Sequence, residues 1–211
     1  MGLGRRAMIA PAPGGARLHF IRHGETEWSL LGRHTGSTDV ALTARGEEEA
    51  RALAPWLGNI TFSRVLSSPR QRALRTCELA GLGAAEIDPD LAEWDYGDYE
   101  GLRRHEIQAR QPGWSIYRDG CPGGETPSAI HTRADRLLAR LRVLEGNVAL
   151  FSHGHFGRVL AARWIGAPID FGLHLALGTA SLGILCTESS HPGIPVIALW
   201  NAAPGALAGG S

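Results

Sequence analysis

The stretch Leu18-His19-Phe20-Ile21-Arg22-His23-Gly24-Glu25-Thr26 decides how this chain folds. Its apolar first half has the character of a buried strand, which stops at an Arg-His pair and is followed at once by a glycine. In open α/β sheets, ligands bind at the carboxyl edge of the strands. The planar guanidinium of Arg22 suits phosphate or carboxylate, and a neutral His23 can act as base, ligand or nucleophile. The stretch therefore predicts an anion-binding site at the edge of a sheet.

Composition fits one globular domain and argues against nucleic-acid binding. The 211 residues include 21 Lys+Arg and 21 Asp+Glu, so the strong basic excess of nucleic-acid binders is missing. The cysteines are too widely spaced for a disulfide framework or a cysteine metal site. Prolines and glycines interrupt the apolar segment after Arg6, and no apolar run is long enough to span a bilayer. We therefore expect a cytoplasmic protein without a signal peptide or a membrane partner.

Strands and helices alternate along the chain, which predicts a three-layer α/β/α sandwich with a mostly parallel sheet and helices on both faces. Strands are expected at 17–22, 62–66, 147–151, 181–187 and 195–200. Helices are expected after the caps Thr43, Ser68 (with Pro69 at the first helical position) and Thr126, the last running to about residue 144, and again after His155.

The remaining segments are predicted to be irregular. A long polar loop occupies 24–40, and a polar insertion at about 86–125, with one short helix near 102–110, covers the carboxyl edge of the strands. We expect residues 1–16 to be a disordered lead-in, 17–201 to be a single domain, and 202–211 to be a flexible tail.

Three of the predicted strands end on side chains that suit phosphate. Arg22 and His23 follow the first strand, Arg72 lies in the first turn of the helix after the second, and His153 follows the third. Two arginines and two histidines could neutralise a phosphoryl group and hold its oxygens. One histidine could then attack phosphorus while a carboxylic acid protonates the leaving oxygen. Glu93, at the start of the polar insertion, is the candidate acid.

Together these residues resemble the histidine phosphatase (phosphoglycerate mutase-like) superfamily over roughly residues 17–200. The resemblance rests on Arg22-His23-Gly24-Glu25-Thr26; on Thr35-Gly36 and Asp39 with Leu42-Thr43-Ala44-Arg45-Gly46; on Ser67-Ser68-Pro69 with Arg72-Ala73 and Thr76; on Glu93 with Tyr96-Gly97; and on Ser152-His153-Gly154. It implies that His23 is the phosphorylated nucleophile, that Glu93 is the proton donor, and that Arg22, Arg72 and His153 form the phosphate pocket. It also implies that neither a metal nor another cofactor is needed.

Two departures refine the resemblance. Many members carry an asparagine after the first motif where this chain has Ser29, whose hydroxyl can still donate a hydrogen bond. Cofactor-dependent mutases carry Arg-His after the acidic residue, whereas Trp94-Asp95 follow Glu93 here, which favours hydrolysis. The stretches 93–101 and 117–125 look most like fungal sedoheptulose-bisphosphatase-type members, which implies a sugar bisphosphate or a related sugar phosphate as substrate.

Six further residues are candidate substrate contacts: Ser29, Thr35, Gly36, Tyr96, Arg118 and Gly154. Arg118 is a candidate for binding a second phosphate group, and its alternative is an ion pair with Asp119. The aromatic residues of the insertion could wall the substrate pocket or form a small core of their own. His153 and His155 could suggest a metal pair, but no third ligand stands at supporting spacing, so no metal site is predicted.

The predicted function is metal-independent hydrolysis of a small phosphorylated metabolite through a phosphohistidine. Two alternatives stay open, a phosphoglycerate-type mutase and a non-catalytic phosphate-binding protein on the same fold. The expected partner is a small-molecule phosphate ester, and a homo-oligomer is possible.

Overall fold

The computed structural model describes residues 15–188, 190–191 and 193–204. The expected lead-in lies outside these residues except for Gly15 and Ala16, and so does the expected tail beyond residue 204. No helix in the described part of the chain is long and apolar enough to cross a membrane.

A six-stranded sheet with the order β3-β2-β4-β1-β5-β6 forms the centre of the fold. Strand β1 pairs in parallel with β4, β4 with β2, and β2 with β3, whereas β5 runs antiparallel to β1 and β6 antiparallel to β5. The expected mostly parallel sheet is thus confirmed. The strands are β1 (Ala16–Arg22), β2 (Phe62–Ser67), β3 (Glu86–Ile87), β4 (Gly146–Ser152), β5 (Leu182–Thr187) and β6 (Pro195–Ala202).

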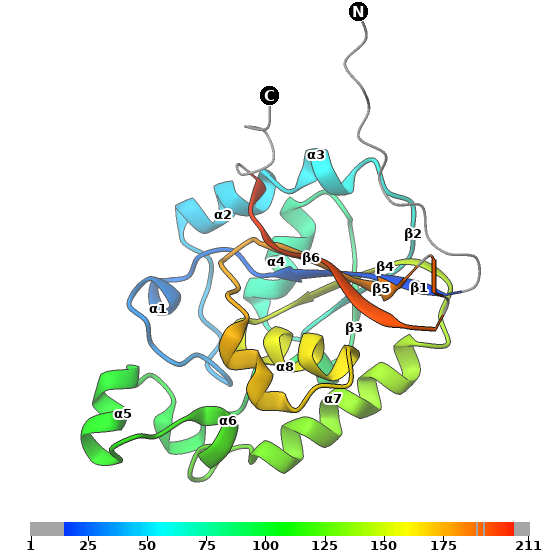
Figure 1. Ribbon diagram of the computed structural model, residues 1–211. Coiled ribbons are helices and arrows are strands. Elements are labelled where there is room, and N and C mark those ends of the chain that lie inside the picture. Colours follow the sequence, from blue (N-terminus) through cyan, green and yellow to red (C-terminus); the bar gives the residue numbers. More distant parts are fainter. Residues whose placement is uncertain (1–14, 189, 192, 205–211) are drawn as a thin grey trace, which may run out of the picture.

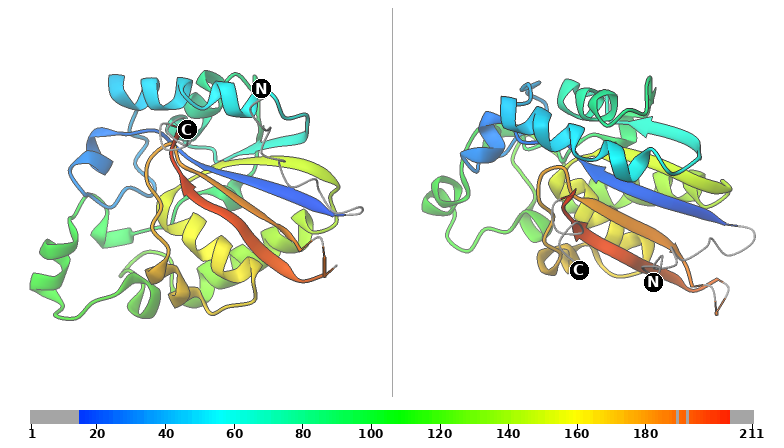
Figure 2. Two further views of the ribbon diagram at one scale, coloured as in Figure 1. Left: turned by 45° about the horizontal axis from the view of Figure 1, so that its top comes forward. Right: turned by 90° about the horizontal axis from the view of Figure 1, so that it is seen from above.

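Helices cover both faces of the sheet, as Figures 1 and 2 show. One face carries α2 (Ala44–Arg51), α3 (Ala54–Leu57) and α4 (Gln71–Leu79), and the other carries α7 (Pro127–Leu141) and α8 (Gly154–Trp164). Successive side chains of β1 point to opposite faces of the sheet, so the apolar core has one part under each helical layer. Leu18 and Phe20 pack in the cluster with α7 and α8, whereas Ile21 packs in the cluster with α3 and α4.

The polar insertion lies beyond the carboxyl ends of β1 and β4, at the left of Figure 1. It holds the 3₁₀ turns η1 (Pro89–Leu91) and η2 (Gly97–Tyr99) and the helices α5 (Arg104–Arg110) and α6 (Ile116–Asp119). Only α5 matches the predicted short helix, because the other three are single turns too short to show a periodic pattern. The aromatic residues of the insertion are buried and belong to the same apolar cluster as the β1, α7 and α8 side chains: Trp94, Tyr96, Tyr99, Trp114 and Tyr117. Tyr96 also lines a cavity.

Several predicted boundaries are wrong. Helix α4 begins at Gln71 with Arg70 as its N-cap, not at Pro69. The reason is that the Ser68 backbone N–H still bonds to the β4 strand, at the Phe151 carbonyl, so the chain stays extended. Helix α7 ends at Leu141, three residues before the predicted end. The polar loop contains a short helix, α1 (Glu27–Leu30), and a 3₁₀ segment, η3 (Ile169–His174), follows α8.

One histidine, His19 on β1, is buried within the fold away from the strand ends. Its Nε2 lies 3.1 Å from Oδ1 of Asn147, and its Nδ1 has no partner among the described residues. Burial is the main cause that lowers its pKa from 6.5 to about 4. Between pH 6.5 and about pH 4, His19 is therefore protonated in the unfolded chain but stays neutral in the folded chain. The stability that depends on neutral His19 is complete above this pH and is lost as the pH falls toward 4.

We expect His19→Gln to weaken the pH dependence of stability. Between about pH 7 and about pH 4.5, the free energy of unfolding should fall by about 2 kcal/mol less in this variant than in the native chain. Chemical denaturation at the two pH values measures the difference. His105→Gln is the control, because His105 is exposed on α5. Identical pH dependence in the native chain and His19→Gln would contradict the assignment.

Candidate active site

His23 follows the last residue of β1 at the carboxyl edge of the sheet. Its side chain is 5% exposed, and its Nδ1 lies 2.7 Å from the carbonyl oxygen of Gly24. A carbonyl only accepts hydrogen bonds, so Nδ1 carries the proton and Nε2 keeps its lone pair. Burial, and then the cations of Arg22 and Arg72, lower the pKa of His23 well below its usual value. His23 is therefore a neutral imidazole whose Nε2 has no hydrogen-bond partner among the described residues.

Arg72 reaches this edge from the first turn of α4 and is fully buried. Its Nε donates to Nδ1 of His153 at 3.2 Å. Its terminal nitrogens donate to backbone carbonyls of the polar loop, to Thr38 at 3.0 Å, Thr35 at 3.0 Å and Gly36 at 3.1 Å. Since carbonyls are neutral, these bonds hold the guanidinium without cancelling its positive charge.

Glu100 of the insertion holds the same loop segment from the other side. Its carboxylate accepts hydrogen bonds from the backbone N–H of Gly36, at 2.9 and 3.0 Å, and from that of Thr38 at 3.0 Å. The carbonyls that bind Arg72 are thus fixed by a carboxylate that does not itself form an ion pair with Arg72. The sequence motifs did not single out Glu100, which here fixes the loop segment that bonds to Arg72.

His153 is a second neutral histidine, directly beside His23. The two rings lie 5.2 Å apart between centroids. Because Nδ1 of His153 accepts from Arg72, the ring proton is on Nε2, which donates to the Ser68 hydroxyl at 2.7 Å. Burial, and then the positive charge of Arg72, lower the pKa of His153 well below its usual value.

Arg22 and Glu93 complete the inner part of the site. Arg22 donates to the Leu177 carbonyl at 2.5 Å, and its buried Nε has no partner among the described residues. Glu93 is 8% exposed and accepts from the backbone N–H groups of Trp94 at 2.9 Å, His155 at 3.0 Å and Phe156 at 2.7 Å. Two of these donors are in the first turn of α8, where N–H groups have no partner within the helix.

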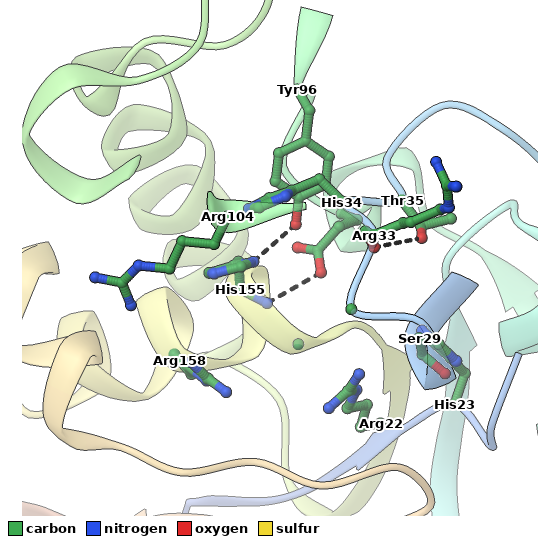
Figure 3. Close-up of a pocket in the computed structure, with 13 residues that line it drawn as sticks. Arg22, His23, Ser29, Arg33, His34, Thr35, Tyr96, Arg104, His155 and Arg158 are labelled. Atoms are coloured by element: carbon green, nitrogen blue, oxygen red, sulfur yellow. Dashed lines mark hydrogen bonds between the residues drawn. The ribbon is translucent and has the colours of Figure 1, made fainter. Parts of the chain in front are cut away.

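These side chains open onto a cavity of about 260 Å³, shown in Figure 3. Seven predicted site residues line it: Arg22, His23, Ser29, Thr35, Glu93, Tyr96 and Gly154. Arg72 and His153 are not in the lining; His153 packs edge-on against His23, and Arg72 bonds to His153. A Cβ on Gly154 would lie 3.4 Å from Cζ and Nε of Arg22, so glycine leaves that guanidinium room.

Three candidate contacts are placed differently from what was expected. The Ser29 hydroxyl donates to the Thr26 carbonyl at 2.9 Å, so its proton is engaged in the cap of α1. The backbone N–H of Gly36 donates to the carboxylate of Glu100 and is therefore not free to contact a substrate. Arg118 is outside the lining, with a side chain 67% exposed and both Nε and Nη2 bonded to Asp119, at 2.9 and 2.7 Å. Arg118 thus forms the ion pair with Asp119 that was the predicted alternative to binding a second phosphate group.

Six lining residues were not predicted as site residues: Gly32, Arg33, His34, Arg104, His155 and Arg158. His155 is in the cavity wall, where its Nδ1 lies 2.7 Å from the Tyr96 hydroxyl. One signal was available, because Arg158 follows Gly154 at the i+4 spacing that places both on one face of a helix. Nothing in the sequence pattern indicated which face of α5 would turn to the cavity.

Comparison with known proteins agrees with this geometry. The family model described as the histidine phosphatase superfamily (branch 1) matches residues 18–202. The chain belongs to this superfamily. An acid phosphatase from Mycobacterium tuberculosis is 43% identical over 187 residues, covering 87% of this chain and 92% of that protein. A sedoheptulose 1,7-bisphosphatase from Saccharomyces cerevisiae is 36% identical over 191 residues, covering 73% of this chain and 69% of the relative.

A solved structure confirms the superfamily fold. The structure of an open reading frame from Mycobacterium tuberculosis superposes with a TM-score of 0.82 at 40% sequence identity, covering 90% of this chain and 98% of that one. The three-layer arrangement and the open, mostly parallel sheet are therefore those of histidine phosphatases.

We expect Glu100→Gln to lower kcat/KM for a chromogenic phosphate ester by about tenfold, because the loop that holds Arg72 loses charge-assisted hydrogen bonds. Steady-state kinetics measure the effect, and the melting temperature shows whether the fold is intact. Glu78→Gln is the matched control, since Glu78 is exposed on α4 and pairs with Arg75. A loss no greater than that of the control would show that Glu100 does not position Arg72.

Proposed function

We propose that this protein hydrolyses small phosphate monoesters through a phosphohistidine intermediate on His23. The observation that carries the proposal is a neutral histidine in the wall of an arginine-lined cavity, whose Nε2 has no partner in the part of the chain that the structure describes. The superfamily to which the chain belongs supports the same reading. We further propose that Arg22, Arg72, Glu93 and His153 act with His23 as the catalytic set.

In the first step, Nε2 of His23 attacks phosphorus, the bond from phosphorus to the leaving oxygen breaks, and Glu93 gives its proton to that oxygen. In the second step, water attacks the phosphohistidine while Glu93 takes a proton from the water. Orthophosphate leaves, and His23 returns to its neutral form. Arg22 and Arg72 offset the negative charge on the transferring oxygens, and they need no rearrangement because their positions are already fixed.

Two observations favour hydrolysis over phosphoryl return to the substrate. The relatives described above are named as phosphatases. In addition, Trp94, which follows the candidate acid, is fully buried and donates from its indole to the Glu125 carbonyl at 2.8 Å, so this position contributes no basic contact to the cavity. A mutase is the second candidate, and stimulation by a catalytic bisphosphate primer would favour it.

For the substrate, we propose a sugar phosphate or sugar bisphosphate. The support is the similarity to a sedoheptulose 1,7-bisphosphatase and the four arginines that line the cavity. Tyr96, Thr35 and Gly154 are the proposed contacts to the organic part of the substrate, because they lie in the lining beside the inner site.

We expect His23→Ala to abolish phosphate release from a panel of sugar monophosphates, sugar bisphosphates and a chromogenic ester. Rapid quenching of the native enzyme should trap a phosphorylated His23 that mass spectrometry locates. A chelator is expected to leave the rate unchanged. Phosphate release by His23→Ala at the native rate would overturn the mechanism, and a native chain that binds phosphate but releases none would point to a non-catalytic binding protein.

We expect Glu93→Gln to slow phosphoenzyme formation from an alkyl phosphate by about a hundred- to ten-thousandfold, because the leaving alkoxide then lacks its proton. A nitrophenyl ester should be affected far less, since its leaving group needs no proton. Single-turnover kinetics on both esters measure this difference. Equal losses on the two esters would show that Glu93 is not the proton donor.

A further inference from the structure

The peptide group between Gly24 and Glu25 is hydrogen-bonded at both ends. Its carbonyl oxygen, on Gly24, accepts from Nδ1–H of His23 at 2.7 Å. Its N–H, on Glu25, donates to Oε2 of Glu49 at 3.0 Å. One planar group thus connects the imidazole of the candidate nucleophile with a carboxylate on helix α2. The sequence motifs did not point to Glu49 as part of the site.

The surrounding backbone holds this peptide group in one orientation. The N–H of Gly24 donates to Oγ1 of Thr76, a fully buried side chain of α4, at 3.0 Å. The chain also touches the start of α2, because a Cβ on Gly24 would lie 2.3 Å from the carbonyl oxygen of Gly46. In the other direction, a Cβ on Gly46 would lie 2.0 Å from the carbonyl oxygen of Glu25. The peptide group therefore keeps its carbonyl toward the imidazole and its N–H toward the carboxylate.

Glu49 is placed to act on this peptide group through its charge. Its side chain is 23% exposed and pairs with Arg45, whose Nε lies 3.4 Å away and whose side chain is 73% exposed. An ion pair so open to water is weak, so it competes little with the N–H of Glu25 for the carboxylate. Hydrogen bonds in a series polarise one another, and a bond to an ionised group is stronger than a neutral one. A carboxylate on the N–H side therefore makes the carbonyl on the other side a stronger acceptor.

We propose that Glu49 is a positioning residue for the nucleophile and that it acts through this peptide group. By polarising the peptide, Glu49 strengthens the bond that holds the proton on Nδ1 of His23, which leaves the lone pair on Nε2. When Nε2 attacks phosphorus, the ring gains positive charge, and the polarised carbonyl stabilises that charge. Nδ1 keeps its proton throughout, and no proton passes to Glu49. This inference rests on the proposed function and deepens it, since it assigns the group that orients the attacking imidazole.

The first test measures the tautomer of His23 without any substrate. Nitrogen NMR of isotope-labelled protein distinguishes a ring nitrogen that carries a proton from one that carries a lone pair, and His23→Ala identifies the resonances. We expect the native chain to hold the proton on Nδ1. In Glu49→Ala, about a tenth of the molecules or more should carry it on Nε2, so that the two resonances move toward each other. Unchanged resonances in Glu49→Ala would overturn the proposal.

The second test separates the charge of Glu49 from its hydrogen bond. Glu49→Gln keeps an oxygen that can accept from the peptide N–H but loses the charge, whereas Glu49→Ala loses both. We expect phosphoenzyme formation from a chromogenic phosphate ester to slow by about three- to tenfold in Glu49→Gln and further in Glu49→Ala, with KM changed by less than about twofold. Glu48→Gln is the matched control, because Glu48 is the exposed neighbour on the same helix, and it should react at the native rate.

Three kinetic outcomes would overturn the proposal. They are a native rate in Glu49→Gln, a loss that appears in KM alone, and an equal loss in the Glu48→Gln control. Melting temperatures show whether each variant keeps its fold. A native enzyme that forms no phosphohistidine would instead overturn the proposed function, and the tautomer measurement would still decide whether Glu49 orients His23.

Discussion

Burial of Arg72 without a carboxylate partner among the described residues is the condition on which the rest of the site depends. Removing a guanidinium from water costs several kcal/mol unless its donors are satisfied. Here the polar loop satisfies them with backbone carbonyls, and Glu100 fixes that loop through its N–H groups. The positive charge is therefore fixed in place and still available to an anion. A carboxylate bonded directly to Arg72 would have fixed it equally well and cancelled the charge.

The parallel sheet brings the two histidines to this charge. Arg22 pairs in register with Ser152, so the residues that follow β1 and β4, His23 and His153, emerge side by side. The neighbouring cations and the lack of water both disfavour protonation of these rings, which keeps them neutral. Sheet topology thus sets the position of His23, and burial together with the neighbouring guanidiniums keeps its ring neutral.

The inner site could be predicted from sequence because its residues stand directly at strand ends, where position along the chain determines position in space. Arg22, His23 and His153 are of this kind, and Arg72 lies within the next helical turn. The outer wall could not be predicted in the same way. Arg104 and His34 reach the cavity through short turns and a loop, whose course depends on tertiary contacts such as the His34–Leu102 bond. Arg118, by contrast, has a neighbouring carboxylate in Asp119, and a local ion pair kept it away from the cavity.

The hydrogen bond between His23 and the Gly24 carbonyl has a chemical consequence of its own. An imidazole can be phosphorylated at either nitrogen, and the two products are different isomers. With Nδ1 held as a donor to a carbonyl, only the nitrogen remote from the backbone can form the bond to phosphorus. In the proposed mechanism, a backbone oxygen one residue along the chain would thus set the regiochemistry of the intermediate, which would be the τ-phosphohistidine and not the π isomer.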